Sequence, residues 1–227
     1  FIALPLFFVL GYVTQRLFIE RVIGRPEAES STLIMTLGFS LLIENFILLV
    51  WSGLPRIINE PYTLATWDIG GVLINHAQTY SLIISLFLIG GLYLFLNKTM
   101  MGKGLRAAAD DPEGCAYMGI NLRVVYGIAF GLGIALTAAG GCLMATYRPF
   151  NPFFGETIIV ILFAAVVLGG MTSVAGALLG GLFIGIIQQL GTLVVPVSLQ
   201  NVAVFLLFVI FLYVRPQGLL GKKGREV

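Results

Sequence analysis

Long apolar segments, most of them close to the length of a membrane crossing, are the feature that most limits how this chain can fold. A truncated run at 1–13 is followed by six more, at residues 32–51, 80–96, 124–147, 157–170, 174–190 and 202–214. They are apolar on all sides instead of along one stripe, which is typical of helices surrounded by lipid. In lipid the backbone must satisfy its own hydrogen bonds, and the segments lack the alternation of barrel strands. The sequence therefore predicts an all-α, polytopic transmembrane helical bundle.

Composition supports this class and excludes others. Of the 227 residues, 58% are hydrophobic and 11% are charged, and the mean hydropathy is +0.99. The net charge of +2 gives no basic excess that would indicate nucleic-acid binding. Cys115 and Cys142 show neither metal-ligand spacing nor a disulfide framework, so both are predicted to be packing residues.

Two of the short apolar runs, 1–13 and 157–170, affect the predicted topology. The run 1–13 falls below the roughly 20 residues that a crossing needs, and because no basic region precedes it and no small-residue cleavage site follows, we expect a truncated crossing with a missing upstream part instead of a signal peptide. The run 157–170 is separated from the next by "GGMTSVAG". The pair 157–190 is either re-entrant or a full hairpin, and both alternatives return the chain to the side it left.

The positions of Lys and Arg predict an orientation. Arg56 and Arg148 would lie outside, in the loops 52–79 and 148–156, if the polar stretch 102–121 is cytoplasmic. The inside would then hold the other eleven cations, namely Arg16, Arg21, Arg25, Lys98, Lys103, Arg106, Arg123, Arg215, Lys222, Lys223 and Arg225. This bias matches the positive-inside rule.

The outer loops carry little that predicts chemistry. Neither resembles a folded domain. Trp67 and Tyr62 are predicted interfacial anchors, and His76 is predicted to be a loop residue.

The polar stretch "GKGLRAAADDPEGCAYMGIN", residues 102–121, predicts short helices at the cytoplasmic face. After the Ala-rich part, Asp111 is suited to the N-cap of a second helix, Pro112 to its first position and Glu113 to its first turn. Gly119 is the expected stop. An ordinary solvated loop is the alternative.

The run "GKGLRAAADDPEGCAYMGINLRVVYGIAFGLGIALTAAGGCLMA" resembles the cytoplasmic loop and following helix of the permease subunits of branched-chain amino acid ABC importers. The likeness continues through "NPFFGETIIVILFAAVVLGGMTSVAGALLGGLFIG" to "RPQGLLG" and reaches back to "IERVIGRP". The chain departs from the family in lacking its N-terminal helices and a Gly that is usual near Thr172.

This resemblance implies a single transmembrane permease domain, 1–227, with a cytoplasmic coupling loop at 98–122 and a basic cytoplasmic tail at 215–227. In such permeases the loop docks on an ATP-hydrolysing subunit, with Arg106 and the acidic pair as the expected contacts here. The residues that fall on the family pattern of the loop are Gly102, Arg106, Ala107, Asp111, Pro112, Glu113, Gly119 and Ile120.

The resemblance also implies the partners: a second, similar permease, two ATP-binding cassette subunits that hold ATP and Mg, and an extracytoplasmic substrate-binding protein. The protein would lie in the bacterial inner membrane with its C-terminus in the cytoplasm. This chain itself would bind no cofactor. The sequence has no G-x-x-x-x-G-K-[ST] phosphate loop, which favours a separate ATPase. Relatives carry branched-chain amino acids, other amino acids, urea, short amides or aromatic acids, and selectivity lies largely in the binding protein.

Candidate path residues lie in two places. Glu44 is the only acidic residue deep in an apolar run, where a charge costs about 2.5–3.5 kcal/mol on insertion scales. Glu44 and Asn45 allow two interpretations. They border the translocation path or the second permease, or Glu44 is a protonated or hydrogen-bonded packing residue. The Gly-rich break can aim half-helix ends at a cavity, so it is predicted to border the path. The residues of this break are Gly169, Gly170, Thr172 and Ser173.

Small residues four apart, Gly127 with Gly131, Gly176 with Gly180 and Gly181 with Gly185, predict close helix packing. Two other function classes are less favoured. A secondary transporter or channel would need no ATPase but predicts more ionisable residues in the membrane. An intramembrane enzyme lacks an H-E-x-x-H or G-x-S-x-G motif.

Overall fold

The computed structural model describes most of the chain, namely residues 2–22, 28–58, 63, 65–69, 72–170, 173–194, 205–206, 208–211, 213 and 218–219. It divides into two compact units, Phe1–Pro152 and Phe153–Val227.

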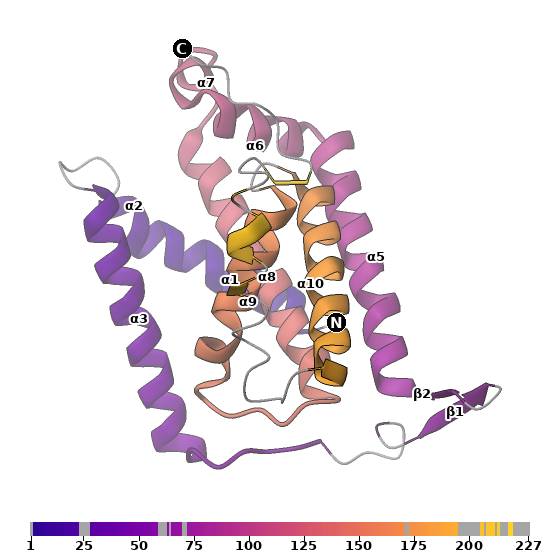
Figure 1. Ribbon diagram of the computed structural model, residues 1–227. Coiled ribbons are helices and arrows are strands. Elements are labelled where there is room, and N and C mark those ends of the chain that lie inside the picture. Colours follow the sequence, from indigo (N-terminus) through magenta and orange to yellow (C-terminus); the bar gives the residue numbers. More distant parts are fainter. Residues whose placement is uncertain are drawn as a thin grey trace. The chain divides into compact units, whose positions relative to one another are not determined.

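The first unit consists of helices and one hairpin (Figure 1). A π-helical turn, Gln15–Ile19, carries the first helix past its predicted end at residue 13. The predicted runs 32–51, 80–96 and 124–147 are found as α3, α5 and α8. The helices are α1 (Ala3–Thr14), α2 (Glu20–Val22), α3 (Ala28–Trp51), α5 (His76–Lys98), α6 (Met100–Asp110), α7 (Pro112–Tyr117) and α8 (Leu122–Ala145).

The second unit contains α9 (Phe154–Gly169) and α10 (Val174–Val194), which pack against each other. The predicted segment 202–214 and the tail 215–227 lie mostly outside the described residues. Four described helices are long and apolar enough to cross a membrane, namely Ser30–Trp51, His76–Lys98, Leu122–Ala145 and Val174–Gly191. These helices confirm the predicted all-α polytopic class.

The loop before α5 corrects two predictions. It contains an antiparallel hairpin of β1 (Thr66–Ile69) and β2 (Val72–Asn75), whereas no strand was predicted. His76 is the first residue of α5 instead of a loop residue, because the Asn75 side chain caps the helix and accepts a 2.8 Å hydrogen bond from the Ala77 N–H. The Trp67 ring contacts the His76 ring at an interplanar angle of 44°, with centroids 4.3 Å apart.

Glycines form the seam between α1 and α8, the most extensive helix contact in the first unit. A Cβ on Gly131 would lie 2.9 Å from the Phe8 carbonyl oxygen, and one on Gly127 would lie 2.6 Å from the Tyr12 ring. Gly11 of α1 faces Gly131 in the same way. The two backbones approach closely at Gly11 and Gly131, and Gly127 makes room for the Tyr12 ring, which agrees with the close helix packing predicted for Gly127 and Gly131.

A second glycine seam joins α9 to α10. A Cβ on Gly176 would overlap the carbonyl oxygen of Gly169, and one on Gly180 would overlap that of Ala165. The neighbouring core contains Ala164, Ala165, Leu168, Ile184 and Phe208. The third predicted pair, Gly181 with Gly185, has open space beside it and makes no such contact among the described residues. Of the cysteines, Cys115 is buried as predicted, whereas Cys142 is exposed.

The first seam yields a test with a control on the same helix. Gly131→Ala should lower the free energy of unfolding by about 1–3 kcal/mol relative to Gly133→Ala, because the new methyl group overpacks against Phe8. Nothing lies within 4 Å of a Cβ at Gly133, and both variants gain the same helix propensity, so their difference isolates the steric effect. Equal thermal unfolding of the two variants in detergent would contradict the seam.

For the second seam, Gly176→Ala should separate α9 from α10, whereas Gly181→Ala, one turn further along the same helix, should be tolerated. Hydrogen exchange of the α9 and α10 amides is the measurement. Faster exchange in Gly176→Ala alone is expected, and unchanged exchange in both variants would argue against close backbone contact.

Candidate functional site

The helix pair α6–α7 follows α5 without a linker. Thr99 ends α5 and caps α6 at once: its Oγ1 donates to the Phe95 carbonyl at 2.7 Å and accepts from the Gly102 N–H at 3.0 Å. A Cβ on Gly102 would overlap the backbone of Phe95 and Leu96. Gly102 therefore permits the tight turn from α5 into α6.

The break between α6 and α7 has the capping geometry predicted from the sequence. Asp111 is extended (φ −149°, ψ 92°), and its Oδ1 accepts from the Gly114 N–H at 2.9 Å. Pro112 and Glu113 occupy the first turn of α7, where a carboxylate faces the positive end of the helix dipole. Gly119, with φ +79°, takes the left-handed conformation that ends this helix.

The inner side of α6–α7 is anchored to α8 by a small core. Ala108 of α6, Cys115 of α7 and Val125 of α8 are buried together, and Leu105 and Ile120 pack against them. This core fixes the helix pair on the rest of the unit, so that its opposite side is free for a partner.

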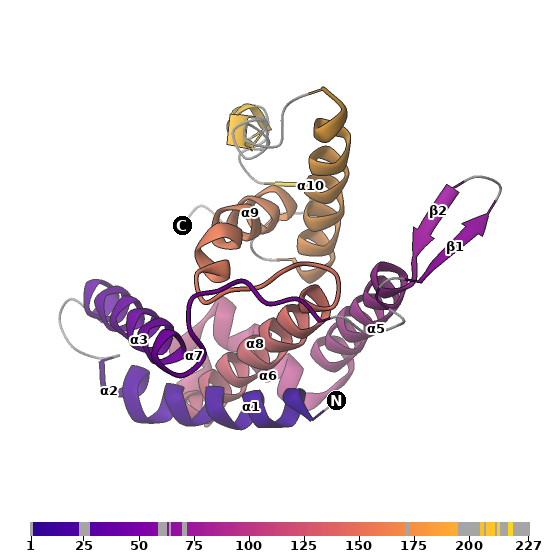
Figure 2. The same ribbon diagram turned by 90° about the horizontal axis from the view of Figure 1, so that it is seen from below.

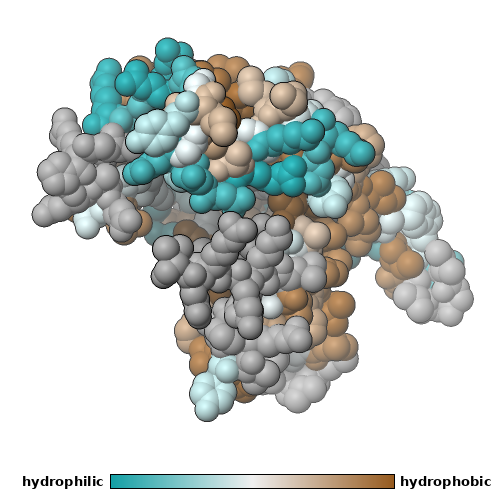
Figure 3. Space-filling view, turned by 90° about the horizontal axis from the view of Figure 1, so that it is seen from above, coloured by the Kyte–Doolittle hydropathy of each residue, from teal (hydrophilic) through white to brown (hydrophobic). Residues whose placement is uncertain are grey.

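The outer side is polar and includes the exposed side chains of Tyr117 and Met118. Hydrophilic residues gather on this face in the view from above (Figure 3). Arg106, Ala107 and Glu113 are exposed on this side. Tyr117 and Met118 are exposed too, at 89% and 86%. Aromatic and Met side chains are enriched at protein interfaces. The sequence analysis missed these two residues, although apolar side chains in a polar loop are the available signal.

The eight predicted coupling residues therefore divide by position. Arg106, Ala107 and Glu113 lie on the outer side, and Asp111 is an exposed cap. The others shape or anchor the helix pair, namely Gly102, Pro112, Gly119 and Ile120.

Cations gather at the end of the first unit that carries α6 and α7. Lys98 and Lys103 lie at the junction of α5 and α6. Arg123 at the start of α8 pairs with Glu20 of α2, with Nε and Oε1 3.0 Å apart. Arg56 lies in the loop after α3, at the opposite end of the unit. The chain returns from that end to α6 through α5. Among the described residues, Lys and Arg are thus more frequent at the α6–α7 end than at the end with Arg56, which is the asymmetry on which the predicted orientation rests.

Glu44 and Asn45 lie on α3, which makes few contacts within the chain. The Asn45 side chain donates to the Leu41 carbonyl of its own helix at 2.7 Å, and Glu44 is half-buried. Thr36 and Ser40 precede Glu44 at intervals of four residues, so they share one face of α3 with it. This polar face, which the sequence analysis did not identify, suits a neighbour that is not lipid.

At the Gly-rich break, the Ser173 N–H donates to the Gly170 carbonyl at 3.1 Å. Gly170 has φ +101°, and the Ser173 hydroxyl accepts from the Gly176 N–H at 3.1 Å at the start of α10. Gly169 and Gly170 are buried, and the Leu219 N–H donates to the Leu168 carbonyl beside them at 2.8 Å. Thr172 lies outside the described residues. In this unit the glycines serve backbone packing.

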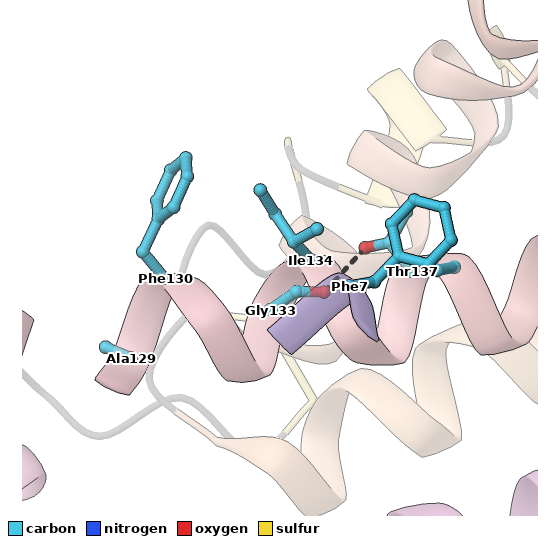
Figure 4. A pocket seen from close by; sticks show the side chains of 7 residues that line it. Phe7, Ala129, Phe130, Gly133, Ile134 and Thr137 are labelled. Atoms are coloured by element: carbon cyan, nitrogen blue, oxygen red, sulfur yellow. Dashed lines mark hydrogen bonds between the residues drawn. The ribbon is translucent and has the colours of Figure 1, made fainter. Parts of the chain in front are cut away.

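An apolar hollow of about 570 Å³ lies between α1 and α8 (Figure 4). Phe7 faces Ile134 and Gly133 across it, and the one hydroxyl in its lining, on Thr137, donates to the Gly133 carbonyl of its own helix at 2.9 Å. The hollow therefore offers packing to an apolar group and no charge. None of the predicted path residues lines it.

Gln15, in the π-helical turn beside Gly127, is a polar residue that the sequence analysis missed. It is only 3% exposed, and its Oε1 has no hydrogen-bond partner among the described residues. Single π-helical turns are frequent at functional sites. The sequence around Gln15 follows an ordinary helical pattern, so it did not predict the π-helical turn.

Comparison with known proteins assigns the family. The pattern of the family described as "Branched-chain amino acid transport system / permease component" matches residues 1–214. The chain is 30% identical to the high-affinity branched-chain amino acid transport system permease protein BraD of Pseudomonas aeruginosa, over 92% of the chain and 70% of the relative. It is 31% identical to LivH of Escherichia coli, a permease protein of the same description, with the same coverage of both chains.

A more distant relative is the fructose import permease protein FrcC of Rhizobium meliloti, at 29% identity over 49% of the chain and 33% of the relative. No solved structure shows a significant match. The family match spans nearly the whole chain and agrees with its four membrane-length helices. The chain therefore belongs to the permease component family of branched-chain amino acid transport systems and is a membrane protein.

Proposed function

We propose that the chain is the membrane-spanning subunit of an ATP-driven importer of branched-chain amino acids, and that α6–α7 couples it to a separate ATPase subunit. The observation that carries this proposal is the build of α6–α7: a capped helix pair that is anchored by a buried core on one side and exposes Arg106, Glu113, Tyr117 and Met118 on the other. An interface needs both a fixed support and exposed aromatic or charged side chains.

The orientation follows from the same element. If α6–α7 meets an ATPase in the cytoplasm, the cations at its end of the unit obey the positive-inside rule, and the loops around Arg56 face outward. An extracytoplasmic binding protein would dock on that outer end, and the C-terminus would be cytoplasmic. ATP and Mg would be held by the partner subunits.

The second permease is the proposed neighbour of α3. This helix packs little within its own chain, and the face with Thr36, Ser40 and Glu44 is unfavourable in lipid. A second subunit on this face would place Glu44 and Asn45 at the subunit boundary or beside the path. The Gly-rich turn from Gly169 to Ser173 would border the path from the second unit.

The substrate class rests on the relatives BraD and LivH, which are permease proteins of branched-chain amino acid transport systems. About half of the chain is also similar to a fructose import permease, at 29% identity. Uptake should therefore be measured for leucine, isoleucine, valine, urea and fructose.

The test is ATP-dependent uptake into proteoliposomes by the full complex. Tyr117→Ala should weaken retention of the ATPase subunit about tenfold and reduce leucine uptake in proportion, because Tyr is enriched among the few interface residues that carry most of the binding energy. Arg106→Ala should act in the same direction. Leucine uptake without ATP, or uptake indifferent to both changes, would contradict the coupling role, whereas uptake of urea or fructose alone would keep the mechanism and replace the substrate.

Two controls separate docking from folding. Asp111→Asn removes the charge but retains a good N-cap, whereas Asp111→Ala also removes the cap, at a cost of about 1 kcal/mol. If only Asp111→Ala loses the ATPase subunit and leucine uptake, Asp111 acts by shaping α7 and not by contacting the partner. Gln78→Ala, an exposed residue at the other end of α5, should leave ATPase retention unchanged.

A further inference from the structure

At the end of α3 that lies away from α6–α7, a hollow of about 420 Å³ opens between two loops. One loop follows α3 and the other follows α8, and the two run side by side (Figure 2). The Arg56 N–H donates to the Phe150 carbonyl at 2.9 Å, and the Phe150 N–H donates to the Arg56 carbonyl at 3.0 Å. This bridge closes one side of the hollow.

The lining of the hollow combines apolar and polar side chains. Its apolar residues are Ile47 and Trp51 from the last turns of α3, and Leu54, Phe150 and Pro152 from the two loops. Arg56 and Asn151 supply polar groups beyond the helix end. Since α3 has the length and composition of a membrane crossing, its end at Trp51 lies at the boundary between hydrocarbon and water, where Trp is enriched. The hollow is therefore amphipathic across that boundary.

The Arg56 guanidinium is held in place at the rim. Its Nη2 donates to the Trp51 carbonyl at 2.9 Å, at the negative end of the α3 dipole. A guanidinium has five N–H donors, and this bond uses one of them. None of the described residues that line the hollow carries a carboxyl group. The site is thus positive and suited to an anion with an apolar part.

We propose that this hollow binds the headgroup of an anionic phospholipid, with the phosphodiester on Arg56 and the acyl chains along the exposed flank of α3. Leu49 and Val50, 87% and 55% exposed, provide an apolar surface for those chains. A free amino acid fits less well, because its ammonium group would meet no carboxylate among the described lining residues. An acidic protein segment that approaches from water would not reach the apolar part beside Ile47.

The proposal is independent of the transport function and is tested on the full chain in neutral detergent. Phosphatidylglycerol with brominated acyl chains should quench the fluorescence of Trp51, measured in a Trp67→Phe background because the chain has two Trp residues. Brominated phosphatidylcholine should bind on the order of tenfold more weakly, since its phosphodiester has the same charge but its choline cation would lie close to the Arg56 guanidinium. Inorganic phosphate should not displace the lipid.

Arg56→Gln should reduce binding of phosphatidylglycerol about tenfold, whereas Arg148→Gln should not, since Arg148 lies on the same side but does not line the hollow. Equal losses in both variants would indicate diffuse surface charge, and unchanged binding in Arg56→Gln would remove Arg56 from the site; either result overturns the proposal. Displacement by inorganic phosphate would make it a phosphate site.

Two further outcomes remain decisive. If Arg56→Gln does not fold, the preference of wild-type quenching for the anionic lipid still decides the case, and Arg56→Lys should retain part of it. If Arg56→Gln lowers uptake while lipid quenching stays unchanged, the hollow belongs to an acidic protein surface and the lipid assignment fails.

Discussion

Close backbone contact at glycines is the interaction on which both units depend. Helices in lipid gain no hydrophobic free energy by associating, because the lipid tails are as apolar as the side chains. Van der Waals contact must hold them together, and it is strongest where no side chain separates the backbones. Gly11 and Gly131 provide this contact for α1 and α8, as Gly176 and Gly180 do for α9 and α10, whereas Gly127 makes room for the Tyr12 ring. Gly181 and Gly185 have the same four-residue spacing but no such neighbour among the described residues, so spacing alone does not make a seam.

Much of the fold was predictable because lipid imposes simple rules on the sequence. Apolar length predicted the long helices, and capping chemistry predicted the α6–α7 break to the residue, since Asp111, Pro112 and Gly119 each have a local conformational preference. Long-range pairing was not predictable. The bridge between Arg56 and Phe150 joins loops that are distant in sequence, and no local pattern encodes such a contact.

The candidate site was predicted only in part for the same reason. A motif identifies which residues form α6–α7 but not which side of it is buried, so Gly102 and Ile120 were grouped with Arg106 although they face the chain itself. Exposure of Tyr117 and Met118 depends on how α7 packs on α8, which needs the three-dimensional structure. For His76 the Asn75 cap outweighed the polar, loop-like composition around it.

Thr99 and Asp111 each end one helix and begin the next, so α5, α6 and α7 are joined through single residues. A flexible linker would absorb a push on α6 by changing its own dihedral angles. Here the Thr99 side chain is hydrogen-bonded to both helices that it joins, and Asp111 is bonded to α7 through its side chain and to α6 through its backbone N–H. A displacement of α6 or α7 would therefore not be absorbed by a flexible linker before it reaches α5.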